Sequence, residues 1–189
     1  MKLISKLDFT QCLLPIDQAS SLPPSCYTSL SVAESEVENI FRKSWIGVGR
    51  ADMVPTPGDY ITLDVADQQI ILLRENTSKL RAFANVCRHR GARLLDGQGS
   101  CKGLRCPFHS WFYGLDGRLV AAPQMEKTKG FDKAENSLIS YRAEERLGFA
   151  FVCLNPDSPH IDTYLGDFAN IHLPWPLETL VSVRRRERI

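Results

Sequence analysis

Four residues in the middle of the chain have the types and spacing of metal ligands. Cys87 and His89 are separated by one residue, and sixteen residues later Cys106 and His109 form a second compact pair. Two thiolates and two imidazoles suit either a [2Fe-2S] cluster with both histidines on one iron or a tetrahedral structural zinc ion. The first group would transfer single electrons, whereas the second would only stabilise a fold.

The composition of each pair favours the iron–sulfur interpretation. Zinc modules usually place two like ligands in each knuckle, whereas both pairs here combine one cysteine with one histidine. In that interpretation Cys87 and Cys106 bind one iron, and His89 and His109 bind the other iron, which is the reducible one. A zinc-stabilised Cys2His2 binding module is the alternative, and it would be colourless where an iron–sulfur protein is reddish-brown.

The overall composition is that of an ordinary globular protein. Of the 189 residues, 43% are hydrophobic and 24% are charged, and the net charge is +1. This charge gives no reason to expect a nucleic acid or an anionic membrane as a partner. The longest apolar run, Leu147 to Leu154, is far shorter than a membrane span, and the N-terminus lacks a secretory signal pattern. We therefore expect a cytoplasmic protein whose six cysteines do not pair as disulfides.

The N-terminal residues 1–45 are expected to form an arm followed by one helix. Residues 1–30 show no sustained periodicity and end in a segment with two adjacent prolines, Pro23 and Pro24. Ser31 and Glu34 have the spacing of a capping box, and apolar residues follow at helical intervals. The pattern predicts a single amphipathic helix from Ser31 to about Ser44.

Residues 46–155 change to an alternating pattern, which predicts a mainly β domain. Both ligand pairs follow predicted strands, so two loop tips could approach one metal centre. Asp116-Gly117 is a strong hairpin signal, and strands of this length and spacing indicate a small antiparallel sandwich or barrel. The predicted strands cover residues 60–65, 69–74, 80–86, 104–105, 111–113, 118–120, 139–146 and 149–154.

The residues around the ligand pairs carry a resemblance to a known family. Asn85–Leu94 and Cys106–Trp111, with Tyr113-Gly114 and Asp116-Gly117 behind them, resemble the N-terminal Rieske [2Fe-2S] part of the α subunit of ring-hydroxylating non-haem iron oxygenases. The resemblance implies a Rieske-type antiparallel β-sandwich with a small cluster-binding subdomain, preceded by one N-terminal α-helix. It also implies a Rieske [2Fe-2S] cluster bound by Cys87, His89, Cys106 and His109.

The resemblance separates the chain from the Rieske proteins of respiratory complexes. Those proteins carry one further cysteine in each loop, and the two form a disulfide; here Ala92 and Phe108 stand at the corresponding positions. A serine that donates to a cluster sulfur in that type is replaced by Trp111. The resemblance thus implies a centre without a disulfide and with a reduction potential near the lower end of the Rieske range, roughly −150 mV.

The implied function is a Rieske electron-transfer module. In the family such a module relays single electrons from a reductase or ferredoxin to a mononuclear non-haem iron, which typically lies in a neighbouring subunit of a trimer. A standalone Rieske ferredoxin is the alternative, although such a carrier would usually be smaller and would lack the helix at Ser31 and the C-terminal tail.

The iron that would use these electrons has no visible ligand set in the sequence. A complete α subunit continues into a catalytic domain that binds mononuclear Fe(II) through two histidines and a carboxylate. The two other histidines, His160 and His172, have no further cluster of ligands around them. We therefore expect residues 156–189, with a helical turn at 164–168 and the start of a strand at 180–183, to lead into a catalytic domain that the chain lacks. The substrate stays open between an aromatic ring and a quaternary amine.

Overall fold

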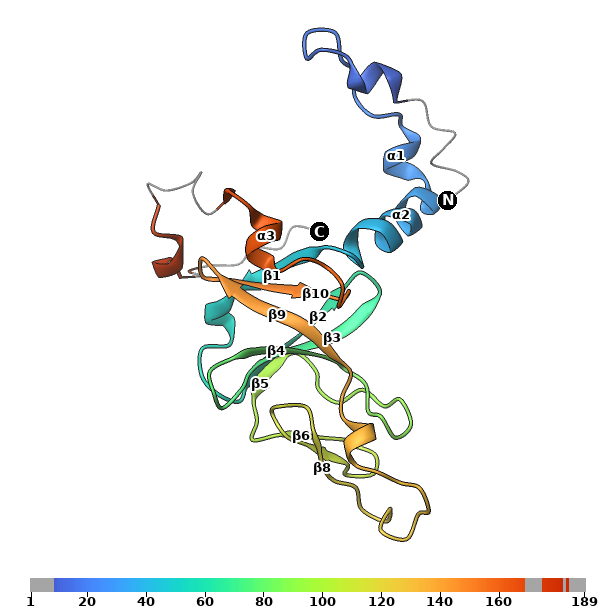
Figure 1. Ribbon diagram of the computed structural model, residues 1–189, viewed down its shortest axis with the longest axis vertical. Helices are drawn as coiled ribbons and strands as arrows, with labels where there is room; N and C mark the ends of the chain where they lie inside the picture. The colour runs from blue at the N-terminus through green and yellow to red at the C-terminus, as the bar shows by residue number, and fades with distance from the viewer. Residues whose placement is uncertain (1–8, 169–174, 182, 184–189) are drawn as a thin grey trace. The chain divides into compact units, whose positions relative to one another are not determined.

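The computed structural model describes residues 9–168, 175–181 and 183 (Figure 1). Its contacts divide the chain into two units, Met1–Lys43 and Ser44–Ile189, which are described one by one below. No helix in the described ranges is long and apolar enough to cross a membrane. Of the residues considered above, His172 lies outside the described residues.

The first unit contains short helical segments, and the last two of them cover the predicted helix. After a 3-10 turn at Thr10–Leu13 come α1 (Ser25–Thr28), α2 (Leu30–Glu36) and a π-helical turn at Val37–Phe41. The helix predicted from Ser31 to about Ser44 corresponds to α2 and this π-helical turn, which together begin one residue earlier and end at Phe41. Pro24 precedes α1 directly, and Ser29 adopts an extended conformation between α1 and α2, so the helical path is interrupted.

The predicted capping box does not form. Ser29 is the residue that precedes α2, and its carbonyl accepts the first helical hydrogen bonds, from the amides of Val32 and Ala33. Ser31 lies inside the first turn, where its hydroxyl is 2.8 Å from that of Ser29. A hydroxyl two residues past the N-cap does not cap the first free amides, and the helix begins one residue before the predicted start.

The second unit is built on antiparallel strands, which confirms the predicted mainly β class. One sheet has seven strands in the order β1-β10-β9-β4-β3-β2-β5, and a second has three in the order β6-β7-β8. In Figure 1 the small sheet lies at the end of the unit away from β1 and β10. The strands are β1 (Trp45–Arg50), β2 (Asp59–Val65), β3 (Gln68–Arg74), β4 (Leu80–Ala84), β5 (Gln98–Ser100), β6 (Leu104–Arg105), β7 (Phe112–Tyr113), β8 (Leu119–Ala121), β9 (Ser140–Arg146) and β10 (Phe149–Cys153).

Two strands were missed by the sequence analysis, and each has a physical reason. β1 contains Gly47 and Gly49, and its register with β10 shifts between them, so its apolar residues do not alternate. β5 consists of three exposed residues without an apolar side chain, and it pairs with β2 only through its backbone register. The two predicted hairpins, β7–β8 and β9–β10, are both present.

The core of this unit is divided by β3, which is buried on both faces. Ile70 and Leu72 pack into one cluster with residues of β2, β4 and β10. Ile71 and Leu73, which point to the opposite face, pack into a second cluster with Phe83 and side chains of the small sheet. All four aliphatic side chains of β3 are fully buried. A strand enclosed on both sides reads as an unbroken apolar run, as β3 does.

The segment after β10 packs against the same unit. Helix α3 (Ile161–Leu165) buries Ile161 against Trp45 and Cys153, and the Trp45 indole Nε1–H donates to the carbonyl of Pro159 at 3.0 Å. The helical turn predicted at 164–168 thus begins and ends earlier. The strand predicted at 180–183 was also wrong for the described residues Leu180, Val181 and Val183, which follow a 3-10 turn.

The first ligand loop follows β4 and is closed by its own backbone. The Cys87 amide donates to the carbonyl of Ala92 at 2.7 Å, and the Gly91 amide donates back to the carbonyl of Cys87 at 3.0 Å. Gly91 has φ of 73°, in the left-handed region that glycine enters without strain. The loop therefore depends on a left-handed residue four positions after its cysteine.

The second ligand loop follows β6 and repeats this arrangement. The Cys106 amide donates to the carbonyl of Trp111 at 2.8 Å, and the Ser110 amide donates to the carbonyl of Cys106 at 3.1 Å. Ser110, again four positions after the cysteine, has φ of 57°. Here a serine occupies the conformation that glycine occupies in the first loop, at a steric cost.

Asn85 joins the two ends of the first ligand loop. Its buried side chain accepts the amides of Leu94 at 3.1 Å and Leu95 at 3.0 Å, and its Nδ2 donates to the carbonyl of Leu95 at 2.8 Å. The Asn85 amide donates to Gln69 of β3 at 2.8 Å. One side chain thus ties the chain before Cys87 to the chain after the loop.

The two left-handed positions predict substitution effects of opposite sign. Gly91→Ala should lower the free energy of unfolding by about 1 kcal/mol through backbone strain alone, because its added Cβ would meet no atom within 4 Å. Ser110→Gly should raise it by up to about 1 kcal/mol. Urea unfolding at equal metal content measures both, and shifts of the same sign would contradict the shared loop geometry.

Asn85→Ala should lower the free energy of unfolding by at least about 2 kcal/mol, because the amides of Leu94 and Leu95 would lose their acceptor in a partly buried place. Asn76→Ala, at an exposed turn, is the matched control and should change it by no more than about 0.5 kcal/mol. Equal losses in the two variants would show that Asn85 does not anchor the loop.

Candidate metal centre

The structure brings all four predicted ligand residues to one pocket. The loops after β4 and β6 approach one another at the end of the unit that carries the small sheet. Between them lies a pocket of about 460 Å³, and no predicted ligand residue lies outside it. Its lining residues are Cys87, His89, Arg90, Gly91, Ala92, Cys106, Phe108 and His109.

The two thiols lie at the closed side of this pocket. Cys87 and Cys106 are each only 2% exposed and belong to the core cluster that also contains Leu73. Burial raises the pKa of the Cys87 thiol, because an ionised sulfur is poorly solvated there. A thiolate at this place therefore requires a positively charged partner, and a bound iron ion is such a partner.

Tyr113 of β7 contacts the first thiol, and the sequence analysis gave it no role. Its hydroxyl lies 3.3 Å from Cys87 Sγ and accepts the amide of Arg88 at 3.1 Å. Burial raises the pKa of Tyr113 far above its ordinary value, so the phenol keeps its proton. Since one of its lone pairs already serves an amide, the hydroxyl proton is free to be donated to a thiolate sulfur.

The two imidazoles lie at the open side of the pocket. The ring centroids of His89 and His109 are 4.8 Å apart; His89 is half-buried and His109 is exposed. His89 Nδ1 is buried and has no hydrogen-bond partner in the structure. Burial lowers the pKa of His89, and Arg90 and His109 lower it further; these effects favour the neutral imidazole, the form that binds a metal.

The donor set fits a two-iron group. Among the described residues, no three His, Cys, Asp or Glu side chains are placed to hold a single ion. A Rieske-type cluster does not need three or more side chains around one ion, because the thiols bind one iron and the imidazoles bind the other. Buried sulfurs on one side and imidazoles on the other, one of them with an unpartnered nitrogen, match that division.

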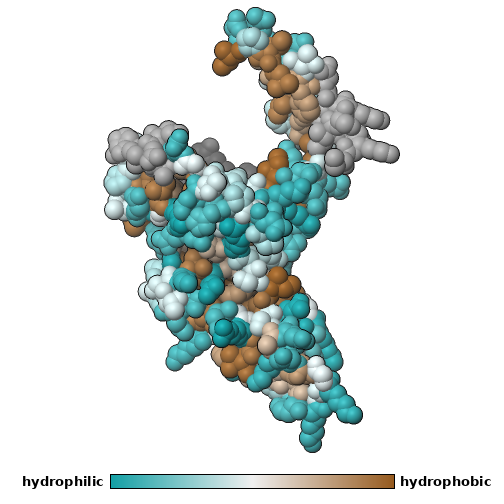
Figure 2. Space-filling model, viewed as in Figure 1, coloured by the Kyte–Doolittle hydropathy of each residue, from teal (hydrophilic) through white to brown (hydrophobic). Residues whose placement is uncertain are grey.

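Among the described residues, neither His160 nor the four remaining cysteines line this pocket. All six cysteines are free thiols, and Phe108, at the tip of the second loop, is 74% exposed. Figure 2 shows hydrophobic side chains at the surface over the small sheet, where Val120 is also exposed. His160 caps α3, where its Nδ1 lies 3.2 Å from Asp162.

Comparisons with known proteins identify the domain. Residues 44–134 match the Rieske [2Fe-2S] domain family. The oxygenase subunit of carnitine monooxygenase from Acinetobacter pittii is 39% identical over 170 residues, which are 89% of this chain and 46% of that protein. The chain therefore spans about half the length of this relative.

Solved structures agree with this match. The quaternary ammonium Rieske monooxygenase CntA in complex with gamma-butyrobetaine is 39% identical, with a TM-score of 0.81 over 87% of this chain and 47% of that one. Naphthalene 1,2-dioxygenase with bound indole is 33% identical, with a TM-score of 0.68 over 74% of this chain and 32% of that one. The cofactor of the domain is a Rieske [2Fe-2S] cluster, and residues 44–134 are a Rieske [2Fe-2S] domain whose homologues are oxygenase α subunits.

Proposed function

We propose that this chain is the electron-transfer module of a Rieske oxygenase. It receives single electrons from a reductase or ferredoxin and passes them to a mononuclear non-haem iron. The observation that carries the proposal is the division of one pocket into buried thiols, Cys87 and Cys106, and outward imidazoles, His89 and His109. When bound, a Rieske cluster supplies reversible one-electron transfer.

In this proposal each residue of the pocket has a separate task. Cys87 and Cys106 hold one iron inside the core, away from water. His89 and His109 hold the other iron, and the exposed ring of His109 marks the side on which electrons leave. Tyr113 donates to the sulfur of Cys87 and so stabilises the added negative charge of the reduced state. The Tyr113 hydroxyl therefore raises the reduction potential. The expected absence of a serine donor at Trp111 lowers it, so the two effects oppose each other.

The electron acceptor is proposed to lie in a neighbouring subunit of a trimer. The monooxygenase CntA is described with inter-subunit electron transfer, and an outward-facing histidine suits an acceptor outside the domain. For the oxygenase as a whole we propose a quaternary ammonium substrate rather than an aromatic ring. Support for this choice is the identity of 39% to the carnitine monooxygenase subunit against 33% to naphthalene dioxygenase.

The ligand assignment predicts the effect of replacing one histidine. His109→Cys should shift the visible spectrum towards that of an all-cysteine [2Fe-2S] cluster and lower the midpoint potential, since a thiolate adds negative charge. Absorption and EPR spectra of the reduced protein measure this change, and His160→Ala at the start of α3 is the control. A spectrum unchanged by His109→Cys would remove His109 from the ligand set, and a colourless, zinc-loaded wild type would end the proposal.

The role of Tyr113 predicts a smaller and purely electrostatic change. Tyr113→Phe should lower the midpoint potential by about 40 mV, the equivalent of a hydrogen bond of about 1 kcal/mol in a one-electron couple. Redox titration followed by EPR measures the shift. Tyr141→Phe is the control, because the Tyr141 hydroxyl donates to Gln68 in the large sheet. This variant should leave the midpoint potential unchanged. Identical potentials in all three proteins would show that Tyr113 does not donate to the centre.

A further inference from the structure

Trp111 lies directly behind one of the two histidines. Its indole stacks on the imidazole of His89 with ring centroids 4.8 Å apart and planes only 10° from parallel. Trp111 is 2% exposed, and it does not line the pocket that contains the four ligand residues. The indole therefore covers one face of His89 without lining the pocket that would hold the metal group.

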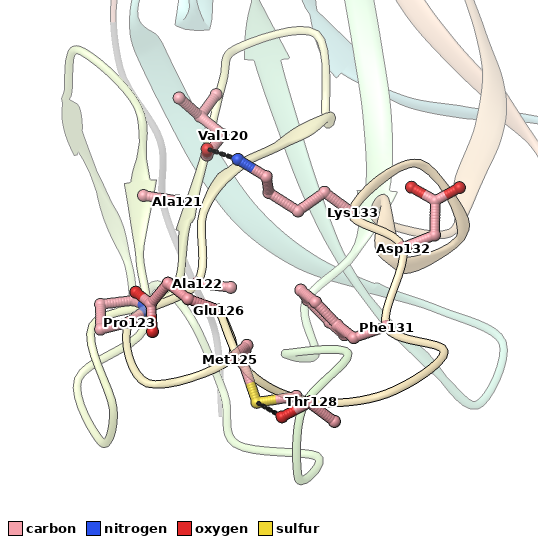
Figure 3. A pocket seen from close by; sticks show the side chains of 10 residues that line it. All are labelled: Val120, Ala121, Ala122, Pro123, Met125, Glu126, Thr128, Phe131, Asp132 and Lys133. Atoms are coloured by element: carbon pink, nitrogen blue, oxygen red, sulfur yellow. Dashed lines mark hydrogen bonds between the residues drawn. The ribbon is translucent and has the colours of Figure 1, made fainter.

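The position of Trp111 is in turn fixed by Phe131. The two rings meet at an angle of 61° with centroids 5.5 Å apart. Phe131 belongs to the loop between β8 and β9, and Figure 3 shows its ring projecting into a separate cavity of about 550 Å³ in that loop. Lys133 holds the loop closed, because its ammonium donates to the carbonyl of Val120 at 3.2 Å. The rings of Phe131, Trp111 and His89 thus form one continuous aromatic contact.

Within the described part of the chain, no aromatic ring stacks on the second histidine as Trp111 stacks on His89. His109 meets His89 edge to face at 78°, and its other aromatic neighbour, Phe108, is tilted by 43° at 6.2 Å and largely exposed. Rotation of an imidazole about χ2 has only broad, shallow preferences, so its orientation depends on such neighbours. The structure constrains one histidine by a flat, buried wall and leaves the other open.

We propose that Trp111, braced by Phe131, is a positioning residue that sets the ring plane of His89 and thereby the orientation of one histidine towards the metal centre. The inference rests on the proposed function, because it requires His89 to be a ligand. Removing the flat wall should disturb one histidine–iron interaction and leave the other as it is. A general loosening of the domain would disturb both.

The test is pulsed EPR of the reduced, full 189-residue chain with 15N-labelled histidine. Wild type should show two histidine nitrogen couplings. In Trp111→Leu one coupling should broaden or be lost, whereas Trp111→Phe, which keeps a flat ring, should restore it. Phe131→Leu should broaden the same coupling to a smaller extent. Phe112→Leu, in β7 of the small sheet and in contact with Arg105, should change neither coupling.

The outcomes separate this inference from the proposal on which it rests. A wild type without any histidine coupling would overturn both. Two wild-type couplings that stay unchanged in Trp111→Leu at full iron and sulfide content would overturn the inference alone, as would equal broadening of both couplings. If Trp111→Leu does not fold, the Phe131→Leu variant provides the test, because Phe131 is partly exposed and its replacement is better tolerated. Histidine nitrogen couplings that stay unchanged in Phe131→Leu would then overturn the inference.

Discussion

The metal site depends on a single strand, β3, whose aliphatic side chains are buried on both of its faces. Ile71 and Leu73 of β3 pack into the same cluster as Cys87 and Cys106, while Ile70 and Leu72 complete the cluster on the opposite face. Burial of each such side chain contributes about 1.5 to 3 kcal/mol. The thiols are therefore held by hydrophobic packing as much as by the backbone of their loops, and a displacement of β3 would displace both.

The parts of the fold that the sequence revealed are those with local signals. The hairpin at Asp116-Gly117 and the apolar run of β3 follow from turn chemistry and from residue type within a few positions. The bulged β1 and the three polar residues of β5 have no such signal, since their pairing is decided by strands distant in sequence. The helix predicted from Ser31 begins one residue earlier, at Leu30, because the backbone carbonyl of Ser29 and not a side-chain cap accepts its first hydrogen bonds.

In the candidate site, too, the residues with a local sequence pattern were predicted and those that act through tertiary contacts were not. The spacing of Cys87, His89, Cys106 and His109 predicted which residues share a pocket, because paired ligands in short loops are a local pattern. The residues that support them were not assigned roles. Tyr113 reaches Cys87 across 26 positions of sequence, and Trp111 reaches His89 through a stack that only the folded chain creates. Such roles depend on tertiary contacts and on no motif.

The matching backbones of the two ligand loops have a consequence for the polarity of the site. Each loop is closed by the same two backbone hydrogen bonds, one donated by the amide of its cysteine and one accepted by the carbonyl of that cysteine, so the two loops share one backbone frame. The histidine, however, stands two residues after the cysteine in the first loop and three residues after it in the second. A frame that is nearly symmetric thus presents one imidazole half-buried and the other exposed to solvent. The one-residue offset in sequence therefore goes with an unequal exposure of the two histidines to water.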